Sequence, residues 1–216
     1  MLDIVIATGN RHKFRELTAL LHMPGIRWHS LAEFPRLPAL RERGTTFDAN
    51  AISKARAAAR ATQLMALADD SGIEVDALGG RPGVRSARFA GTHGGDVANN
   101  VKLLAAMDGV PYRKRGARYQ CSLALVQGAR VIALTRGAWG GRIATAPRGR
   151  GGFGYDPLVV VPRLGKTVAQ LGPGVKRRSS HRAVAARRMR RVLERMLTAR
   201  GRTGAAGSRR ARVPAA

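Results

Sequence analysis

The chain has 216 residues, of which 44% are hydrophobic, so length and composition predict one domain with an ordinary apolar core. Its 39 Lys and Arg against 13 Asp and Glu give a formal net charge of +26, typical of anionic partners or of an Arg-rich genome. One cysteine excludes an internal disulfide framework and predicts the cytoplasm, and no apolar run is long enough to predict a membrane partner.

The first part of the chain alternates short apolar runs with helical patterns. Residues 2–8 form a β-branched apolar run, which predicts a buried strand. Apolar residues then recur at helical spacing, which predicts a helix that begins near Asn10. A second helix is expected over 46–62, and a second buried strand over 64–68 that ends at Asp69.

The middle of the chain predicts a helix and a hairpin. Asp96 is expected to cap a helix that runs through Val97, Val101 and Leu104. Apolar residues alternate over 119–125, which predicts a half-buried strand. The run 131–134 is expected to pair with that strand as a hairpin.

The end of the chain predicts one more strand, over 158–161, and a helix that begins near Ser180. Because helices and strands interleave, the predicted fold is α/β, with a mixed central β-sheet flanked by helices. Residues 199–216 lack apolar periodicity and are predicted to form a disordered basic tail after one domain over 1–198. Such a tail would contact nucleic acid through charge alone.

The first polar motif, TGNRHK, follows the first strand. Gly9 allows the backbone to approach a ligand closely, and the helix that begins after Asn10 offers free N–H groups. Lys13 adds a full positive charge in the first turn. The motif therefore predicts a phosphate cradle, although an ordinary strand–turn–helix junction stays open for this hexapeptide alone.

The second motif is a cluster of acids, in which Asp69 and Asp70 are adjacent. Neighbouring side chains on a strand point to opposite faces, so at most one of the two faces a cleft directly. A carboxylate at the end of a buried strand needs a cation or a donor. Mg²⁺ binding and water activation both use carboxylates, whereas the competing interpretation is a turn that includes Ser71.

The last two motifs are GGFGYDP and KRRSSHR. Glycines on both sides of Phe153 favour a loop that lays the ring against a flat ligand, or a turn with a core aromatic. In the second motif His181 and Arg182 fall in the first turn of a helix, where cations oppose the helix dipole. Stability explains these two residues poorly, and their donors suit an anion or a carbonyl-rich base.

Together the motifs resemble those of the inosine triphosphate pyrophosphatases. The matching stretches follow that family's order along the chain: TGNRHK, TFDANAISKA, ADDSGIEVDALGGRPGVRSARFAG, PRGRGGFGYDP, and KT followed by KRRSSHR. The resemblance implies two lobes with the active site in the cleft between them, a homodimer, and Mg²⁺ as cofactor. It also implies hydrolysis of the non-standard purine triphosphates ITP, dITP and XTP to monophosphate and pyrophosphate, which removes them from the nucleotide pool.

The resemblance also implies roles for individual residues. Asp70 is the expected proton acceptor and a metal ligand, Glu42 is the second metal ligand, and Ser71 contacts the substrate. The expected phosphate-binding residues lie near the first two helices: Thr8, Gly9, Asn10, Lys13 and Lys54. The expected base-binding residues lie in the last two motifs: Phe153, Gly154, Tyr155, Asp156, Lys176, His181 and Arg182.

Two other functions stay open. One is a related pyrophosphatase that acts on modified pyrimidine nucleotides, against which the His181–Arg182 pair argues. The other is a nucleic-acid-binding protein on a degenerate enzyme scaffold, suggested by the net charge and by Ala49, where the family often has Glu. Retention of the phosphate- and base-binding residues argues against the second.

Overall fold

The computed structural model describes residues 1–34, 42–91 and 95–208, the last eight of them as helical backbone alone. The strands form one sheet, in the spatial order β2 (Ile26–Ser30), β1 (Leu2–Ile6), β3 (Met65–Val75), β4 (Gly116–Gln127), β5 (Arg130–Ile143), β6 (Val159–Val161) and β7 (Lys166–Thr167). β1 is parallel to both of its neighbours, and the remaining pairs are antiparallel. The predicted mixed sheet is therefore confirmed.

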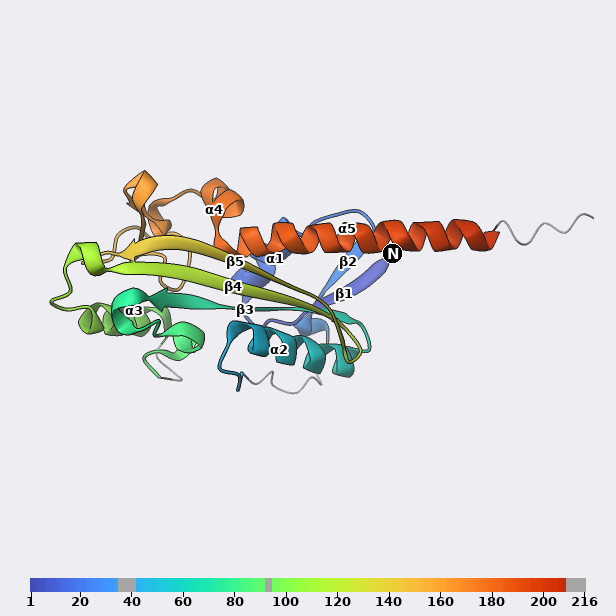
Figure 1. Cartoon of the computed structure of the whole chain (residues 1–216), viewed down its shortest axis with the longest axis horizontal. Coiled ribbons are helices and arrows are strands. Elements are labelled where there is room, and N and C mark those ends of the chain that lie inside the picture. Colours follow the sequence, from blue (N-terminus) through green and yellow to red (C-terminus); the bar gives the residue numbers. More distant parts are fainter. Residues whose placement is uncertain (35–41, 92–94, 209–216) are drawn as a thin grey trace, which may run out of the picture.

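The helices cover both faces of this sheet (Figure 1). The α-helices are α1 (Arg11–Leu20), α2 (Phe47–Thr62), α3 (Gly95–Ala106), α4 (Pro173–Ser179) and α5 (His181–Ser208). The 3₁₀ helices are η1 (Leu31–Glu33), η2 (Asp76–Leu78), η3 (Gly83–Arg88), η4 (Tyr112–Lys114), η5 (Pro162–Leu164) and η6 (Val168–Gln170). Among the described residues, no helix combines the length and the hydrophobicity that a membrane span requires.

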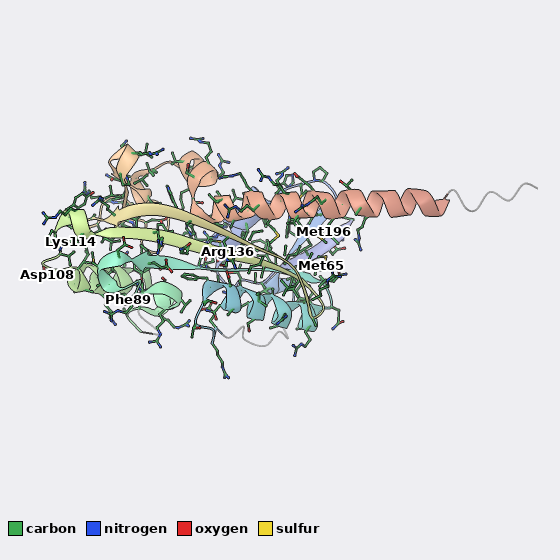
Figure 2. The ribbon with its side chains drawn as sticks, in the orientation of Figure 1. Met65, Phe89, Asp108, Lys114, Arg136 and Met196 are labelled. Atoms are coloured by element: carbon green, nitrogen blue, oxygen red, sulfur yellow. The ribbon has the colours of Figure 1, made fainter. Side chains whose placement is uncertain are left out.

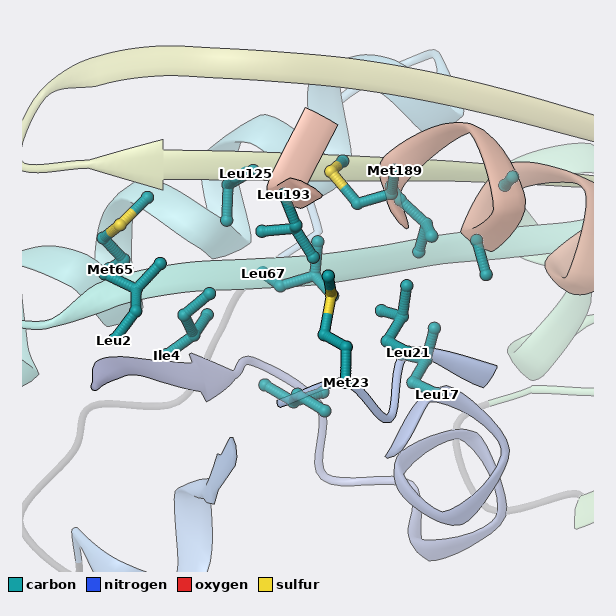
Figure 3. Close-up of a cluster of buried hydrophobic side chains, with 14 of the residues drawn as sticks. Leu2, Ile4, Leu17, Leu21, Met23, Met65, Leu67, Leu125, Met189 and Leu193 are labelled. Atoms are coloured by element: carbon teal, nitrogen blue, oxygen red, sulfur yellow. The ribbon is translucent and has the colours of Figure 1, made fainter. Parts of the chain in front are cut away.

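Successive side chains of β3 point to opposite faces of the sheet, and each face has its own hydrophobic core. Met65 and Leu67 pack with α1 and α5 in the cluster drawn in Figure 3, whereas Ala66 and Ala68 pack against α2. A further apolar cluster surrounds Ile73 at the other end of β3. Polar residues of β3 separate this cluster from the first two, while the two lobes and the cleft between them stay a prediction.

Side chains at the two ends of the sheet show the same division (Figure 2). Met65 and Met196 lie toward one end and belong to the cluster under α5. Phe89 lies toward the other end, with Asp108 and Lys114 beyond it, and packs on the cluster around Ile73.

Three of the predicted helix starts are confirmed by their caps. The Asn10 side chain accepts from the backbone N–H groups of His12 and Lys13. Thr46 Oγ1 accepts from the Ala49 N–H, and Ser180 Oγ accepts from the N–H of Ala183. The Thr46 cap thus forms without the Glu that would complete a capping box.

The expected end of the second strand at Asp69 is wrong. β3 continues to Val75, because β4 pairs with it in register from Ala66 opposite Val126 to Val75 opposite Ala117. The long antiparallel partner supplies ladder hydrogen bonds past the acids. β1, by contrast, pairs with β3 only as far as Leu67.

The helix expected through Val97, Val101 and Leu104 is confirmed as α3, but of these three residues only Leu104 packs on the core. Val97 is 78% exposed and Val101 is 63% exposed, whereas Asn99 and Leu103 are buried. Asp96 lies within the first turn of α3, because the helix begins at Gly95. The core-facing side of α3 therefore includes Leu103 and Leu104, while Val97 and Val101 face solvent.

Two features at the chain's edges were missed or placed differently. β2 was missed because its residues are partly exposed and only Ile26 and Trp28 reach the core beneath α5. α5 continues as helix to Ser208, across the boundary expected after residue 198. Residues 209–216 of the expected tail lie outside the described residues.

His29 ties the edge strand β2 to β1 and to η1. Its Nε2 lies 2.9 Å from Asp3 Oδ1, and its Nδ1 lies 2.8 Å from Glu33 Oε2. These hydrogen bonds raise the pKa of His29 above 6.5, so their stabilisation is complete below pH 6.5 and is lost as the pH rises through the raised value. Between about pH 5.5 and 8.5 we expect the Tm to fall by about one or two degrees more than in His29→Gln. Equal pH profiles in thermal scans would contradict this expectation.

Candidate active site

The two adjacent acids of β3 serve opposite faces of the sheet, as predicted. Asp69 meets residues of α1 and α5, whereas Asp70 meets residues of α2. Both lie beyond the last β3 residue that pairs with β1, so on that side the sheet has no strand next to them. The chain that follows β1, beginning at Thr8, crosses this edge, where ligands of open α/β sheets usually bind.

Around Asp70 the carboxylates share one cation. Lys54 Nζ lies 2.8 Å from Asp70 Oδ1 and 2.7 Å from Glu42 Oε1. Asn50 Nδ2 donates to Asp70 Oδ2 at 3.1 Å, and Arg88 Nη1 donates to Glu42 Oε2 at 2.9 Å. Asn50 and Arg88 were missed, although Asn50 precedes Lys54 by one helical turn and that spacing could have found it.

Burial and neighbouring charges give the carboxyl groups of Asp70 and Glu42 different pKa values. Burial, aided by the Glu42 charge, raises the pKa of Asp70 to about 6 despite the opposing effect of Lys54. Burial also acts on Glu42, but Lys54 and Arg88 outweigh it and hold its pKa at about 2. Asp70 is therefore the member of the pair that can exchange a proton near neutral pH.

On the opposite face Asp69 binds two of the predicted site cations. Lys13 Nζ lies 2.5 Å from Asp69 Oδ1, and Arg182 Nε lies 2.9 Å from Asp69 Oδ2. The same carboxylate accepts from Ser71 Oγ at 2.9 Å and from Cys121 Sγ at 3.2 Å. The Asp69 side chain is 0% exposed, and Lys13 is within its reach because α1 starts at this edge of the sheet.

Arg182 at the start of α5 is compensated by the protein itself, contrary to the expectation that a ligand must do so. Besides Asp69, it contacts Glu16 Oε2 through Nη1 at 2.5 Å and Ser71 Oγ through Nη2 at 2.9 Å. The two carboxylates offset the unfavourable helix dipole. Glu16 also lies 3.0 Å from Lys176, and nothing in the motifs had indicated it.

His181 is neutral rather than cationic. Burial and the nearby Arg182 charge lower its pKa well below 6.5. Its ring stacks on Tyr119, with centroids 4.8 Å apart and planes at 13°. Its Nδ1 is buried and finds no hydrogen-bond partner among the described residues. A buried polar atom of this kind is normally satisfied, so it can take a ligand atom.

The Gly-rich loop is held by Asp156. Asp156 Oδ2 accepts from the Phe153 N–H at 3.0 Å and from Lys176 Nζ at 2.9 Å, and Asp156 Oδ1 accepts from the Tyr119 hydroxyl at 2.9 Å. Gly154 has a φ of +63°, which disfavours any side chain there. The predicted loop residues thus lie together with Lys176.

Phe153 presents its ring beside cations and an imidazole. The His12 ring is stacked on it at a centroid distance of 5.2 Å, and Lys176 Nζ lies 4.7 Å from its centroid. Tyr155 is buried, and its hydroxyl donates to the Ser86 carbonyl. Phe153 is therefore the loop aromatic available to a flat ligand, while Tyr155 anchors the loop.

A cavity of about 110 Å³ joins these groups. It is lined by Asn10, Lys13, Ser71, Gly72, Ser86, Ala87, Asp96, Asn99, Tyr119, Phe153, Gly154, Tyr155, Asp156, Lys176, His181 and Arg182. The predicted residues Thr8, Gly9, Glu42, Lys54 and Asp70 lie outside this lining. The cap formed by Asn10 also satisfies two of the N–H groups expected to be free for phosphate.

The Ham1 family profile matches residues 4–192 of the chain. The chain is 48% identical over 203 residues to the dITP/XTP pyrophosphatase of Geobacillus kaustophilus, covering 94% of this chain and 100% of the relative. A HAM1 protein from Coxiella burnetii superposes with a TM-score of 0.84 at 40% identity, covering 90% and 100% of the two chains. The nucleoside-triphosphatase / dITP/XTP pyrophosphatase of Mycobacterium abscessus gives 0.70 at 39%, covering 82% and 93%. The fold is thus shared with solved Ham1 structures, and the chain belongs to the Ham1 family.

Proposed function

We propose that this protein hydrolyses the non-standard purine triphosphates ITP, dITP and XTP to the monophosphate and pyrophosphate, and so removes them from the nucleotide pool. The observation that carries the proposal is one cavity lined by both Phe153 and Lys13, with the Asp70–Lys54 pair near Lys13. The relatives from G. kaustophilus and M. abscessus, both named as dITP/XTP pyrophosphatases, support it.

The base binds at the Phe153 end. The purine stacks on Phe153 where the His12 imidazole now lies, and such stacking contributes about 1–3 kcal/mol per base. Arg182 donates one N–H each from Nε, Nη1 and Nη2 to the protein, so two of its five N–H groups remain for a purine carbonyl. A proton on Nδ1 of neutral His181 adds another donor. Adenine has an amino group at the 6-position and would leave these donors unpaired, which disfavours ATP.

The triphosphate binds toward Lys13 and Lys54, which offset part of its charge. Phosphoryl chemistry requires mainly positioning and charge stabilisation. Asp70, with a pKa of about 6, is ionised at neutral pH and accepts a proton from the attacking water. Ser71 lies beside Lys13 and contacts the substrate.

The residues present fit a magnesium ion. Glu42 and Asp70 converge on a single point, since each places an oxygen within 2.8 Å of Lys54 Nζ. No cluster of three or more acidic, His or Cys side chains suited to a metal occurs in residues 1–34, 42–91 and 95–208, and Mg²⁺ typically uses one or two carboxylates with substrate phosphates. When bound, the ion would neutralise phosphate charge and polarise water.

Pyrophosphate release from ITP, dITP, XTP, ATP and GTP, with and without Mg²⁺, tests this function. We expect the first three to be turned over with a kcat/KM at least about 100-fold above that of ATP, and chelation by EDTA to abolish turnover. Preference for a modified pyrimidine triphosphate would favour the related pyrophosphatase. No purine hydrolysis together with tight RNA binding at physiological salt would favour the nucleic-acid-binding protein.

Assembly and location complete the proposal. The enzyme acts as a homodimer, as its sequence resemblance implies, and light scattering of the purified protein measures this directly. Its one cysteine, Cys121, is buried as a free thiol, which suits the reducing cytoplasm. Contact with nucleic acid, if it occurs, involves the basic C-terminal residues and weakens with added salt.

A further inference from the structure

Asp69 has a position that the proposed reaction does not by itself require. Its carboxylate is fully buried and forms ion pairs with residues of two elements that are far apart in sequence. Oδ1 contacts Lys13 of α1, while Oδ2 accepts from Arg182 of α5. The hydroxyl of Ser71 and the thiol of Cys121 complete its hydrogen bonds.

The two cations held by Asp69 have different roles in the proposed function. There Lys13 is assigned to the triphosphate, and Arg182 is assigned to the purine. Each keeps donors for a ligand, because an ammonium has three N–H groups and a guanidinium has five. A fixed carboxylate between them therefore fixes the distance between base recognition and phosphate recognition.

A purely structural role explains this arrangement less well. Burying a carboxylate is costly unless it is paired, and apolar residues in place of the whole ion-pair cluster would avoid that cost. Every charged partner of Asp69 instead lines the substrate cavity. Glu16 and Lys176 extend the same network of ion pairs to the Phe153 loop.

We infer that Asp69 is a positioning residue that holds Lys13 and Arg182 at a set separation, so that only a substrate whose base and phosphates both fit is aligned for attack. The inference rests on the proposed function. It makes base selection depend on a side chain that touches neither the base nor the phosphates. A misplacement of about 1 Å at such a site costs about 100-fold in rate.

The test compares Asp69→Asn with the wild type on ITP and ATP. We expect Asp69→Asn to lower kcat/KM for ITP by about 100-fold and to narrow the ITP-to-ATP preference by about 10-fold or more. Asp69→Glu, which keeps the charge but moves it by one methylene, should narrow the preference less. A merely structural role would lower Tm without changing this ratio of kcat/KM values.

Asp48→Asn is the matched control, because it breaks an ion pair with Arg136 away from the cavity. It should leave the preference unchanged. If Asp69→Asn does not fold, Cys121→Ala, which removes only the thiol donor to Oδ2, should narrow the preference about two- to threefold. A folded variant with the full wild-type preference overturns the inference. A wild type inactive on every purine triphosphate instead overturns the proposed function, and this inference with it.

Discussion

Replacing Asp70 with Asn is expected to lower kcat for ITP by about 100-fold or more. The amide keeps the shape of the side chain but loses both its charge and its ability to accept a proton. Asp70 accepts from Lys54 and Asn50 at once, and an amide offers only one oxygen for these donors. Steady-state turnover at saturating ITP measures the effect.

Glu74→Gln is the control for Asp70→Asn. Glu74 is a carboxylate on the same strand, but it pairs with Arg118 and Gln120 outside the cavity. We expect its turnover to stay within about twofold of the wild type, since a partly exposed ion pair contributes at most about 1 kcal/mol. An Asp70→Asn enzyme with the turnover of the Glu74→Gln enzyme would rule out Asp70 as the proton acceptor.

The second large effect is expected at Gly137 on β5. A Cβ at this position would overlap the carbonyl oxygen of His181 and lie 2.6 Å from the backbone nitrogen of Ala185. Because these are backbone atoms, the first turn of α5 must move. We expect Gly137→Ala to cost about 3 kcal/mol, or about 6–12 °C in Tm, and to lower kcat/KM for ITP as the helix carries His181 and Arg182 away.

Gly140→Ala provides the comparison, since it lies on the same strand and its added Cβ would meet nothing within 4 Å. Its Tm should stay within about 2 °C of the wild type. Thermal scans and ITP kinetics on both variants show whether the effect is specific to the close approach of α5 at Gly137. The alternative is that any Gly→Ala substitution on β5 destabilises the fold. Equal Tm values for the two would show that α5 does not need the close approach at Gly137.

Local signals in the sequence predicted much of the framework. The caps at Asn10, Thr46 and Ser180 are formed by side chains within three residues of the N–H groups they accept, so a sequence window contains the whole interaction. The alternating pattern over 119–125 correctly predicted a strand there, but not a half-buried one, because β4 is buried on both faces from Cys121 to Val126.

Long-range pairing explains what the sequence did not predict. The length of β3 depends on β4, whose ladder continues it beyond Asp69 although the polar acids favoured a stop. Val97 and Val101 face solvent on α3, so their spacing indicated a helix but not its buried face. The edge strand β2 has no full apolar pattern to detect.

The candidate site shows the same limit. Motif resemblance proposed the site residues, and the structure brings some of them, including Lys13, Phe153 and Arg182, to one cavity. Resemblance did not indicate that Glu16 compensates Arg182, because that contact joins α1 to α5 across 166 positions. The neutral state of His181 also depends on burial and on its neighbour, which a motif does not specify.

The alternation of Asp69 and Asp70 has a consequence for how this gene can diverge. Substitutions sample one side chain at a time, and a strand can absorb many of them. One inserted or deleted codon between Met65 and Asp69 would instead send both carboxylates to the wrong faces at once, separating Lys54 and Arg182 from their partners together. We therefore expect selection to act more strictly on the number of residues between Met65 and Asp69 than on their identity. Related sequences should differ in this segment by substitutions and not by insertions or deletions.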